Sequence, residues 1–320
     1  MVKVGMAEAG MIKEKMTNPE ISEDTAADIT TDTNHSSNNT VITGTLAKMR
    51  NLLAGDSDSF DTPSVAYELP MGDQNIALNP LIGRSIRLNF TGQIFCSHCG
   101  RKTKKSFSQG HCYPCFKKLA SCDMCIMKPE TCHFDQGTCR EPEWAQDFCF
   151  KPHYVYLANS SGIKVGITRG TQIPTRWMDQ GAIQALPIMK VSARKLSGLV
   201  EVIIAEHVSD KTNWRKMLKN DVETLDLKAI RDQLLEACDE QLQALKEEHG
   251  DDAMQWLDEE PIDIHYPVKV YPTKVTSFNF DKNPLVEGTL MGIKGQYLLL
   301  DTGVINIRKF AAYEVELSYD

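Results

Sequence analysis

Short apolar runs alternate with polar positions at both ends of the chain, and this pattern predicts strands. The first group comprises Val41-Ile42, Val65 to Leu69, and the alternating Ile86, Leu88 and Phe90. After Pro261 similar runs return at 285–291, 296–300, 304–307 and 314–317, with glycine-containing turns between them. Short strands with tight glycine turns are typical of small barrels and sandwiches. We therefore predict that segments 39–93 and 261–320 together form a small β-barrel or sandwich from the chain ends.

The pattern changes between residues 151 and 220. His153 to Ile167 predicts two strands joined at the turn residues 159–162, and a helix is expected over 173–180. A strand at 186–191 and an apolar helix at 196–207 complete a β-β-α-β-α core. Residues 221–260 carry leucines at helical spacing and predict an acidic helical segment. The expected fold class is therefore α+β.

The first 38 residues are rich in Thr, Asn, Ser, Asp and Glu. Such a composition buries too little apolar surface to offset the entropy of ordering, so a disordered tail is expected. The chain as a whole is 42% hydrophobic and 24% charged, as ordinary globular proteins are. No run of eighteen apolar residues and no secretory signal pattern is present, which favours the cytoplasm.

Charge is unevenly distributed around the net value of −8. Residues 94–220 carry 19 Lys and Arg against 10 Asp and Glu, whereas residues 221–260 carry 3 against 14. Metal-bound thiolates would remove about four of the positive charges in the first segment, since a four-cysteine zinc site is roughly −2. The middle of the chain stays basic, which is compatible with nucleic acid as a partner, either DNA or RNA.

Cysteine pairs indicate a metal module at residues 94–150, because nine of the ten cysteines lie between Cys96 and Cys149. Two residues between paired cysteines let both sulfurs reach one tetrahedral Zn²⁺ at about 2.3 Å. Disulfides are less compatible with a chain of this size that has no export signal. The first predicted structural zinc site consists of Cys96, Cys99, Cys112 and Cys115.

A second predicted zinc site begins at another Cys-x-x-Cys pair. Its four ligands are Cys122, Cys125, Cys132 and Cys139, the last three separated by equal six-residue gaps. His133 or Cys149 could replace one ligand, an iron-sulfur cluster is an alternative, and the later cysteines could instead be buried small apolar residues. Four thiolates leave no open position for water, so both sites are interpreted as structural.

Lysines follow the first pair of cysteines, at Arg101 to Lys105, and the second pair, at Lys117-Lys118. Cationic loops on zinc modules contact phosphate in some proteins and only improve solubility in others. Both interpretations remain open for these residues.

Four positions of the predicted core stand in a recognisable order: Tyr156 on the first strand, Val165-Gly166 on the second, Arg176 on the first helix and Glu201 on the next. With these positions, residues 155 to 220 resemble the GIY-YIG nuclease superfamily. It implies metal-dependent phosphodiester hydrolysis. Glu201 would hold Mg²⁺ or Mn²⁺, Arg176 would bind the scissile phosphate, and Tyr156 would position or deprotonate water.

Several positions depart from that family. Tyr154 stands where glycine is usual, and Lys164 replaces the second tyrosine, as it does in one phage-derived branch. Glu206 competes with Glu201 for the metal position, and Asn213 and Asn220 are the candidates for the family's late asparagine. Each matched residue has an alternative structural explanation, as a strand aromatic or a solvent-facing helix residue.

The whole chain also resembles an uncharacterised bacterial family with zinc-binding cysteines, DUF2797. The resemblance covers residues 40 to 320 and includes the zinc cysteines, Pro174-Thr175-Arg176-Trp177 and Gly292 to Tyr297. No activity follows from it.

The sequence is compatible with three functions. The chain is a zinc-containing nucleic-acid-binding protein that acts as a metal-dependent phosphodiesterase, a non-catalytic binding or scaffold protein with a nuclease-like fold, or an RNA-modifying enzyme. The last needs a cofactor site, and no nucleotide-binding loop or hydrolase triad is recognisable. Convergence of Tyr156, Lys164, Arg176 and Glu201 on one cleft would favour catalysis.

Overall fold

The computed structural model describes residues 40–54, 64–208 and 212–320. The expected tail at residues 1–38 lies outside the described residues. All of these described residues belong to one compact unit, and the expected α+β class is confirmed. Within the described ranges, no helix has the length and apolarity that a membrane span requires.

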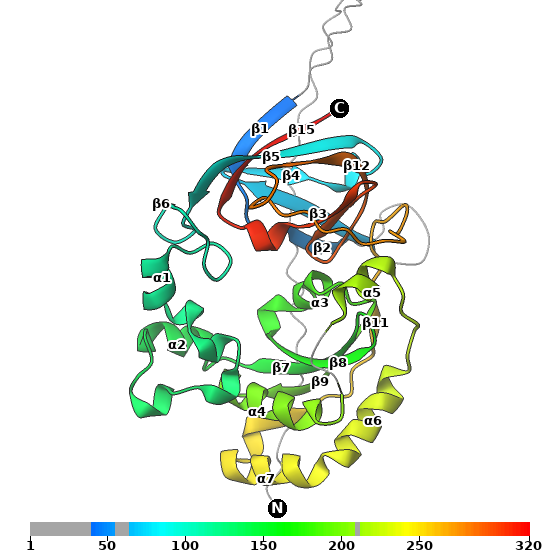
Figure 1. Ribbon diagram of the computed structural model, residues 1–320. Helices are drawn as coiled ribbons and strands as arrows, with labels where there is room; N and C mark the ends of the chain where they lie inside the picture. Colours follow the sequence, from blue (N-terminus) through cyan, green and yellow to red (C-terminus); the bar gives the residue numbers. More distant parts are fainter. Residues whose placement is uncertain (1–39, 55–63, 209–211) are drawn as a thin grey trace, which may run out of the picture. The chain divides into compact units, whose positions relative to one another are not determined.

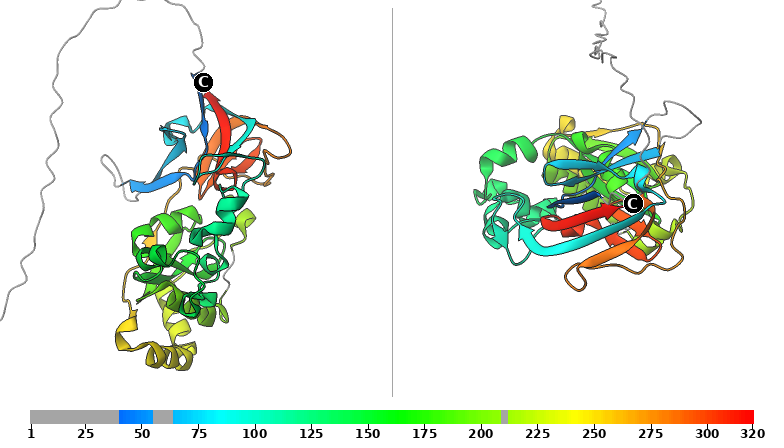
Figure 2. Two further views of the ribbon diagram at one scale, coloured as in Figure 1. Left: turned by 90° about the vertical axis from the view of Figure 1, so that its left-hand side faces the viewer. Right: turned by 90° about the horizontal axis from the view of Figure 1, so that it is seen from above.

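Strands from both ends of the described chain build the largest sheet (Figure 1). The register pairs Thr40 with Tyr319 and Leu285 with Asn89, so early and late strands alternate over β1, β15, β5 and β12. The adjacent positions of β1 and β15 are visible again in Figure 2. The sheet follows the order β1 (Thr40–Thr45), β15 (Tyr313–Tyr319), β5 (Ser85–Phe95), β12 (Leu285–Lys294), β13 (Tyr297–Leu300) and β14 (Gly303–Asn306), with β6 (Lys102–Thr103) paired to β5.

A second, three-stranded sheet shares the core of the first. It consists of β2 (Arg50–Ala54), β3 (Ser64–Met71) and β4 (Gln74–Ala77). Alternate residues of β3, including Tyr67 and Leu69, are buried in one apolar cluster with residues of β5 and β12. Two antiparallel sheets with a common core are the expected arrangement for strands that bury one face.

The β-β-α-β-α core lies between these halves in the sequence. Its sheet follows the order β10-β9-β7-β8, so β8 is an edge strand in the part of the chain that the structure describes. Its elements match the predicted order closely. They are β7 (His153–Asn159), β8 (Ile163–Arg169), α3 (Thr175–Asp179), β9 (Gln184–Val191), α4 (Arg194–Ala205) and β10 (Met254–Trp256), with β11 (Ile262–Asp263) also paired to β9.

Helices cover both faces of this sheet (Figure 1). Alternate strand residues such as Val155 and Leu157 are buried together with apolar residues of α4 and the acidic segment, whereas Tyr156 is buried with Trp177 of α3. The acidic segment therefore uses its leucine face to cover a sheet. Its helices are α6 (Leu227–Ala237) and α7 (Asp239–His249), preceded by α5 (Trp214–Lys219).

The cysteine-rich segment contains little regular structure. It has two short helices, α1 (Tyr113–Lys118) and α2 (Pro142–Phe148), and several single 3₁₀ turns. Its apolar cluster is small and consists mainly of cysteines. A segment with so little apolar core needs another source of stability, which metal ligation can supply.

The glycine-rich stretch at 292–295 differs from its predicted role as a turn. β12 continues through Lys294, and the turn follows at Gly295-Gln296. Lys294 is fully buried, and its Nζ donates a hydrogen bond to Asn220 Oδ1 at 2.7 Å. Burial lowers the pKa of Lys294 from 10.5 to about 7.

Because its pKa is lowered in the folded state, Lys294 should make the protein more stable as the pH rises above 7. Between pH 7 and 10 the unfolded chain keeps this proton and the folded chain does not, so the free energy of unfolding should rise with pH by about 1.4 kcal/mol per unit. Urea titrations from pH 7 to 9.5 should show this rise. The rise should be smaller in Lys294→Met and unchanged in the exposed-lysine control Lys282→Met; equal slopes in all three proteins would contradict the assignment.

Candidate metal centre and basic cleft

Four cysteines of two Cys-x-x-Cys pairs meet at one point. The sulfurs of Cys96, Cys99, Cys112 and Cys115 lie within 4.8 Å of one another, and the Cys99 and Cys112 sulfurs are 3.7 Å apart. Tetrahedral ligands at 2.3 Å from a zinc ion are separated by about 3.8 Å. This group can therefore hold a metal ion.

Two glycines with positive φ and two backbone hydrogen bonds shape the loops that carry these cysteines. The amide of Gly100 donates to Cys96 carbonyl at 2.8 Å, and Gly100 has a φ of +70°, which favours glycine. Gly110, before the second pair, has a φ of +130° and receives the amide of Ser97 at its carbonyl.

Electrostatics also favours a cation at this point. Burial disfavours ionisation of Cys96, yet backbone N–H donors from Cys112, Cys99 and His98 outweigh it and lower the pKa to about 6. Burial and then the neighbouring thiols raise the pKa of Cys115 to about 12. Four thiols this close together cannot all lose their protons without a cation, because the thiolates would repel one another. A bound divalent ion offsets that repulsion and allows four thiolates.

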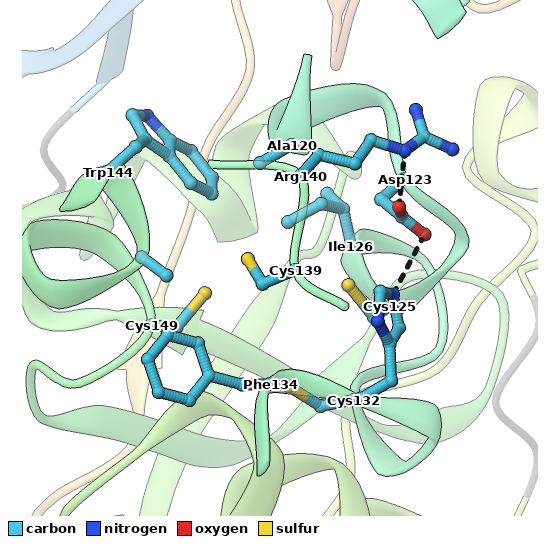
Figure 3. Close-up of a pocket in the computed structure, with 12 residues that line it drawn as sticks. Ala120, Asp123, Cys125, Ile126, Cys132, Phe134, Cys139, Arg140, Trp144 and Cys149 are labelled. Carbon is cyan, nitrogen blue, oxygen red and sulfur yellow. Dashed lines mark ion pairs between the residues drawn. The ribbon is translucent and has the colours of Figure 1, made fainter. Parts of the chain in front are cut away.

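The later cysteines surround a separate cavity of about 20 Å³ (Figure 3). Cys122 is not among its lining residues and is buried with the first group of cysteines. A compact group of a different kind, Asp123, Cys125 and His133, lies at one side of this cavity and could also hold an ion. The four cysteines that line the cavity are Cys125, Cys132, Cys139 and Cys149.

A larger cavity, of about 300 Å³, opens beside the β8 edge of the central sheet. Arg176 of α3 and Glu201 of α4 both line it, although these helices pack on opposite faces of the sheet. Because β8 is an edge strand, residues from both faces can reach the same space. Strand β8 itself contributes Ile167, Thr168 and Arg169 to the lining. We call this cavity the basic cleft.

Tyr156 lies beneath the basic cleft and does not line it. The side chain is fully buried, and its hydroxyl donates to Gln180 Oε1 at 3.0 Å. Burial raises the pKa of Tyr156, while the charge of Arg176 and a hydrogen bond from it oppose this rise. Gly166 faces the ring, since a Cβ there would lie 2.7 Å from the Tyr156 hydroxyl. Tyr156 is therefore in contact with Arg176 but enclosed by protein.

Lys164 does not join the other predicted residues at the basic cleft. It is 5% exposed and pairs with Ala158 near the β7–β8 turn, whereas the cleft takes residues 167–169 from the other end of β8. Three strand residues span about 10 Å. Of the four predicted residues, Arg176 and Glu201 therefore line the basic cleft, whereas Tyr156 and Lys164 do not.

The alternative residues Glu206, Asn213 and Asn220 lie away from the basic cleft. Glu206 is exposed at the end of α4. Asn213 caps the start of α5 by accepting the Lys216 amide, and Asn220 adopts a left-handed conformation at its end while accepting from Lys294. None of the three lines the basic cleft.

Two cationic residues of the basic cleft come from the β-rich parts of the chain. Lys48 lies between β1 and β2, and Arg308 lies in the short turn at Ile307–Phe310. Lys48 pairs with Asp179, which is almost fully buried and also accepts from Asn51 and Gln296 at 2.8 Å. The Asp179 carboxylate therefore offsets the charge of Lys48 and has three donors around it.

Neutral groups position three of the arginines. Arg169 stacks on the Phe148 ring at 4.0 Å, and Arg194 donates to the Ile126 carbonyl at 2.6 Å. Arg308 donates to Gln109 Oε1 at 2.6 Å. These contacts orient the guanidinium groups without neutralising them.

The arginines of the basic cleft lie close enough to repel one another. Burial, followed by the positive charge of Arg176, lowers the pKa of Arg308. Burial also lowers the pKa of Arg194, with Cys149 opposing the shift and Arg176 and Arg169 adding to it. An anion between them would relieve this repulsion, so the site is suited to a phosphate-like group.

No sequence signal identified most of these cations. Lys48, Arg169, Arg194 and Arg308 come from four separate segments, and none belongs to a recognisable motif. Only their meeting in space gives them a common role.

These features define an α+β protein with a cysteine cluster that could hold a metal ion and a basic cleft beside a β-β-α-β-α core. The family model described as "Protein of unknown function (DUF2797)" matches residues 83–315. The chain belongs to this family, as its cysteines and central motifs predicted. No curated protein and no solved structure matches the chain.

Proposed function

We propose that the protein binds the phosphodiester backbone of nucleic acid, DNA or RNA, in the basic cleft. The observation that carries this proposal is the meeting of Arg169, Arg176, Arg194 and Arg308 around one cavity of about 300 Å³. Arginine forks match phosphate oxygens in bidentate geometry, and each neutralised phosphate releases counterions. The positive excess of residues 94–220 supports an extended polyanion as the partner.

Zn²⁺ is the proposed ion of the four-cysteine group at Cys96, Cys99, Cys112 and Cys115. Thiolate ligands in tetrahedral array select zinc or iron, and the Cys-x-x-Cys spacing is typical of structural zinc. Lys104 and Lys105, which follow the first pair, line a separate pocket with Lys309 and one carboxylate, Asp281, and can extend the phosphate-binding surface. Reduced thiols fit a cytoplasmic location.

Phosphodiester hydrolysis is the second part of the proposal, and it is supported by Glu201. This carboxylate lies on the same cavity as Arg176 and is close enough to influence the pKa of Tyr156. One or two carboxylates with several waters suffice for Mg²⁺ or Mn²⁺, and such an ion would activate water and polarise a phosphoryl oxygen. Arg176 would hold the phosphate, and Tyr156 would orient Arg176 from below.

A non-catalytic binding function is favoured by a different observation. The Tyr156 hydroxyl is enclosed, and Lys164 is buried at the far end of β8, so neither offers its polar group to the cavity. Binding requires only the arginines. Binding and cleavage are therefore tested separately.

Removal of arginine should weaken nucleic-acid binding in a salt-dependent manner. Arg176→Ala and Arg308→Ala should each lower the affinity for fluorescent single-stranded and duplex DNA and RNA by about tenfold at low salt. Each should also reduce the slope of log affinity against log salt by about one. Arg87→Ala is the matched control, since Arg87 is exposed and lies outside the basic cleft.

Unchanged anisotropy titrations in both cleft variants would refute binding at this site. Cleavage is measured on the same labelled strands with Mg²⁺ or Mn²⁺. If Glu201 acts in hydrolysis, Glu201→Gln should abolish cleavage while Glu206→Gln leaves it intact. Binding by the wild-type protein without cleavage of any of these substrates would establish the non-catalytic function.

A further inference from the structure

The cavity between the later cysteines is the feature that the proposed function does not explain. Its four thiols come from separate places: Cys125 from a 3₁₀ turn, Cys132 from the end of the next turn, Cys139 from a loop and Cys149 from the end of α2. Figure 3 shows them around the same space. A volume of about 20 Å³ is enough for one water-sized particle or ion and for little else.

Asp123 and His133 lie against each other, with His133 Nε2 3.6 Å from Asp123 Oδ1, and each also has another partner. The Asp123 carboxylate accepts from Arg140 Nε at 2.5 Å, while Nδ1 of His133 lies 2.7 Å from Thr138 Oγ1. Arg140 also donates to the carbonyls of Phe116 and Leu119. Asp123 therefore helps to fasten the first cysteine group to the second, and a metal ion there would compete with a close ion pair.

Cys122 is separated from the cavity by its packing. It is 8% exposed and belongs to the apolar cluster of Cys96, Cys112, Cys115 and Leu119. Its neighbour in the pair, Cys125, points to the cavity instead (Figure 3). The third Cys-x-x-Cys pair is thus divided between two environments.

We propose that Cys125, Cys132, Cys139 and Cys149 form a second metal site, with one Zn²⁺ bound by four thiolates. Four soft sulfur donors around one small cavity favour zinc over hard cations, which prefer oxygen. In the structure these four sulfurs do not all lie within 4.8 Å of one another, as those of the first group do, so one ion would draw them closer together. The six-residue gaps between the first three ligands and the nine-residue gap before the fourth allow each ligand to come from a different turn. The site has no open position and is structural.

The second metal site would hold one wall of the basic cleft. Ile126, Met127 and Pro129, which lie between its first two ligands, line the cleft. At the other end, the Cys149 carbonyl accepts the amide of Arg194, the first residue of α4. One ion would thereby fix both the loop that Arg194 contacts and the start of the helix that carries Glu201.

Metal content of two alanine variants tests the site directly. The purified wild-type chain should contain two zinc ions by elemental analysis. Cys149→Ala should contain about one zinc ion. Cys122→Ala should keep both, although it removes the buried thiol that forms a Cys-x-x-Cys pair with the proposed ligand Cys125. A Cys149→Ala protein that keeps two ions, or a Cys122→Ala protein that loses one, would overturn the assignment.

The wild-type chain provides a measurement that does not depend on folding of a variant. Cobalt substituted into two four-thiolate sites should give twice the thiolate-to-cobalt absorption of one site. A group of Asp123, Cys125 and His133 would instead add only about a quarter of a four-thiolate signal, since it has one thiolate. His133→Ala should leave the spectrum unchanged; a second signal of only about a quarter of the first that disappears in His133→Ala would favour that group and overturn the four-thiolate site.

The connection with nucleic acid rests on the proposed function, whereas the metal count does not. If both are right, Cys149→Ala should lose one ion and bind labelled nucleic acid at least fivefold more weakly. Loss of the ion with unchanged affinity would keep the metal site but refute its effect on the cleft. Failure of both arginine variants to weaken binding would refute the cleft alone.

Discussion

Cys112→Ala should release one zinc ion per chain and unfold the segment around residues 96–119. Cys112 is 2% exposed. It belongs both to the four-cysteine group that could hold a metal ion and to the small apolar cluster beside it. The segment has few other buried apolar residues, and structural zinc sites contribute apparent free energies on the order of 10 kcal/mol to folding. We expect the free energy of local unfolding to fall by at least 4 kcal/mol, measured by amide hydrogen exchange and by the zinc content.

Cys238→Ala is the matched control for this variant. Cys238 is equally buried but lies at the end of α6 among the leucines of the acidic segment. Its replacement should leave the zinc content unchanged and cost about 1 kcal/mol through lost packing. Hydrogen exchange at 96–119 that is alike in the two variants would contradict the role of the metal.

Gly198→Ala should destabilise the protein, although the same change stabilises most helices. Alanine in a helix interior is favoured over glycine by about 1 kcal/mol. At Gly198 of α4, however, a Cβ would lie 2.7 Å from the amide nitrogen of Glu130 and 2.7 Å from the Pro129 Cβ. The loop cannot yield without moving its backbone, so we expect a net loss of about 2–3 kcal/mol in urea unfolding.

The same variant should disturb the basic cleft, because Pro129 lines it. We expect affinity for labelled nucleic acid to fall several-fold. Val202→Ala is the control on the same helix, at a side chain that is 47% exposed, and it should change stability by less than about 0.5 kcal/mol. Stabilisation by Gly198→Ala would show that α4 and the loop are not tightly packed.

Most of the regular structure follows from local patterns in the sequence. The strands at β7, β8 and β9 and the helix α4 lie where alternation and helical spacing predict them. Short elements without a strong pattern were missed, such as β2, β4 and α2, because tertiary contacts decide whether a few residues pair. The end of β12 was placed too early, since a lysine between two glycines suggested a turn and burial of Lys294 could not be anticipated.

The sequence predicts a site only where its residues are close together along the chain. Cys96, Cys99, Cys112 and Cys115 form two close pairs, and the spacing alone indicates that each pair can share an ion. The third pair carries the same spacing, yet Cys122 and Cys125 face different environments, which depends on the packing of Leu119 and not on spacing. Arg308 and Lys48 reach the basic cleft from opposite ends of the sequence, so no local signal could reveal them.

The pairing of β1 with β15 sets the order in which the chain can fold during translation. The strand partners of β1 and β5 include β15 and β12, which the ribosome makes only after the cysteine-rich segment and the central core. The core can bury its apolar faces as it emerges, whereas the earliest strands must wait for partners with their edges uncovered. Premature termination before β12 would therefore leave an intact centre attached to unpaired strands, a product prone to aggregate.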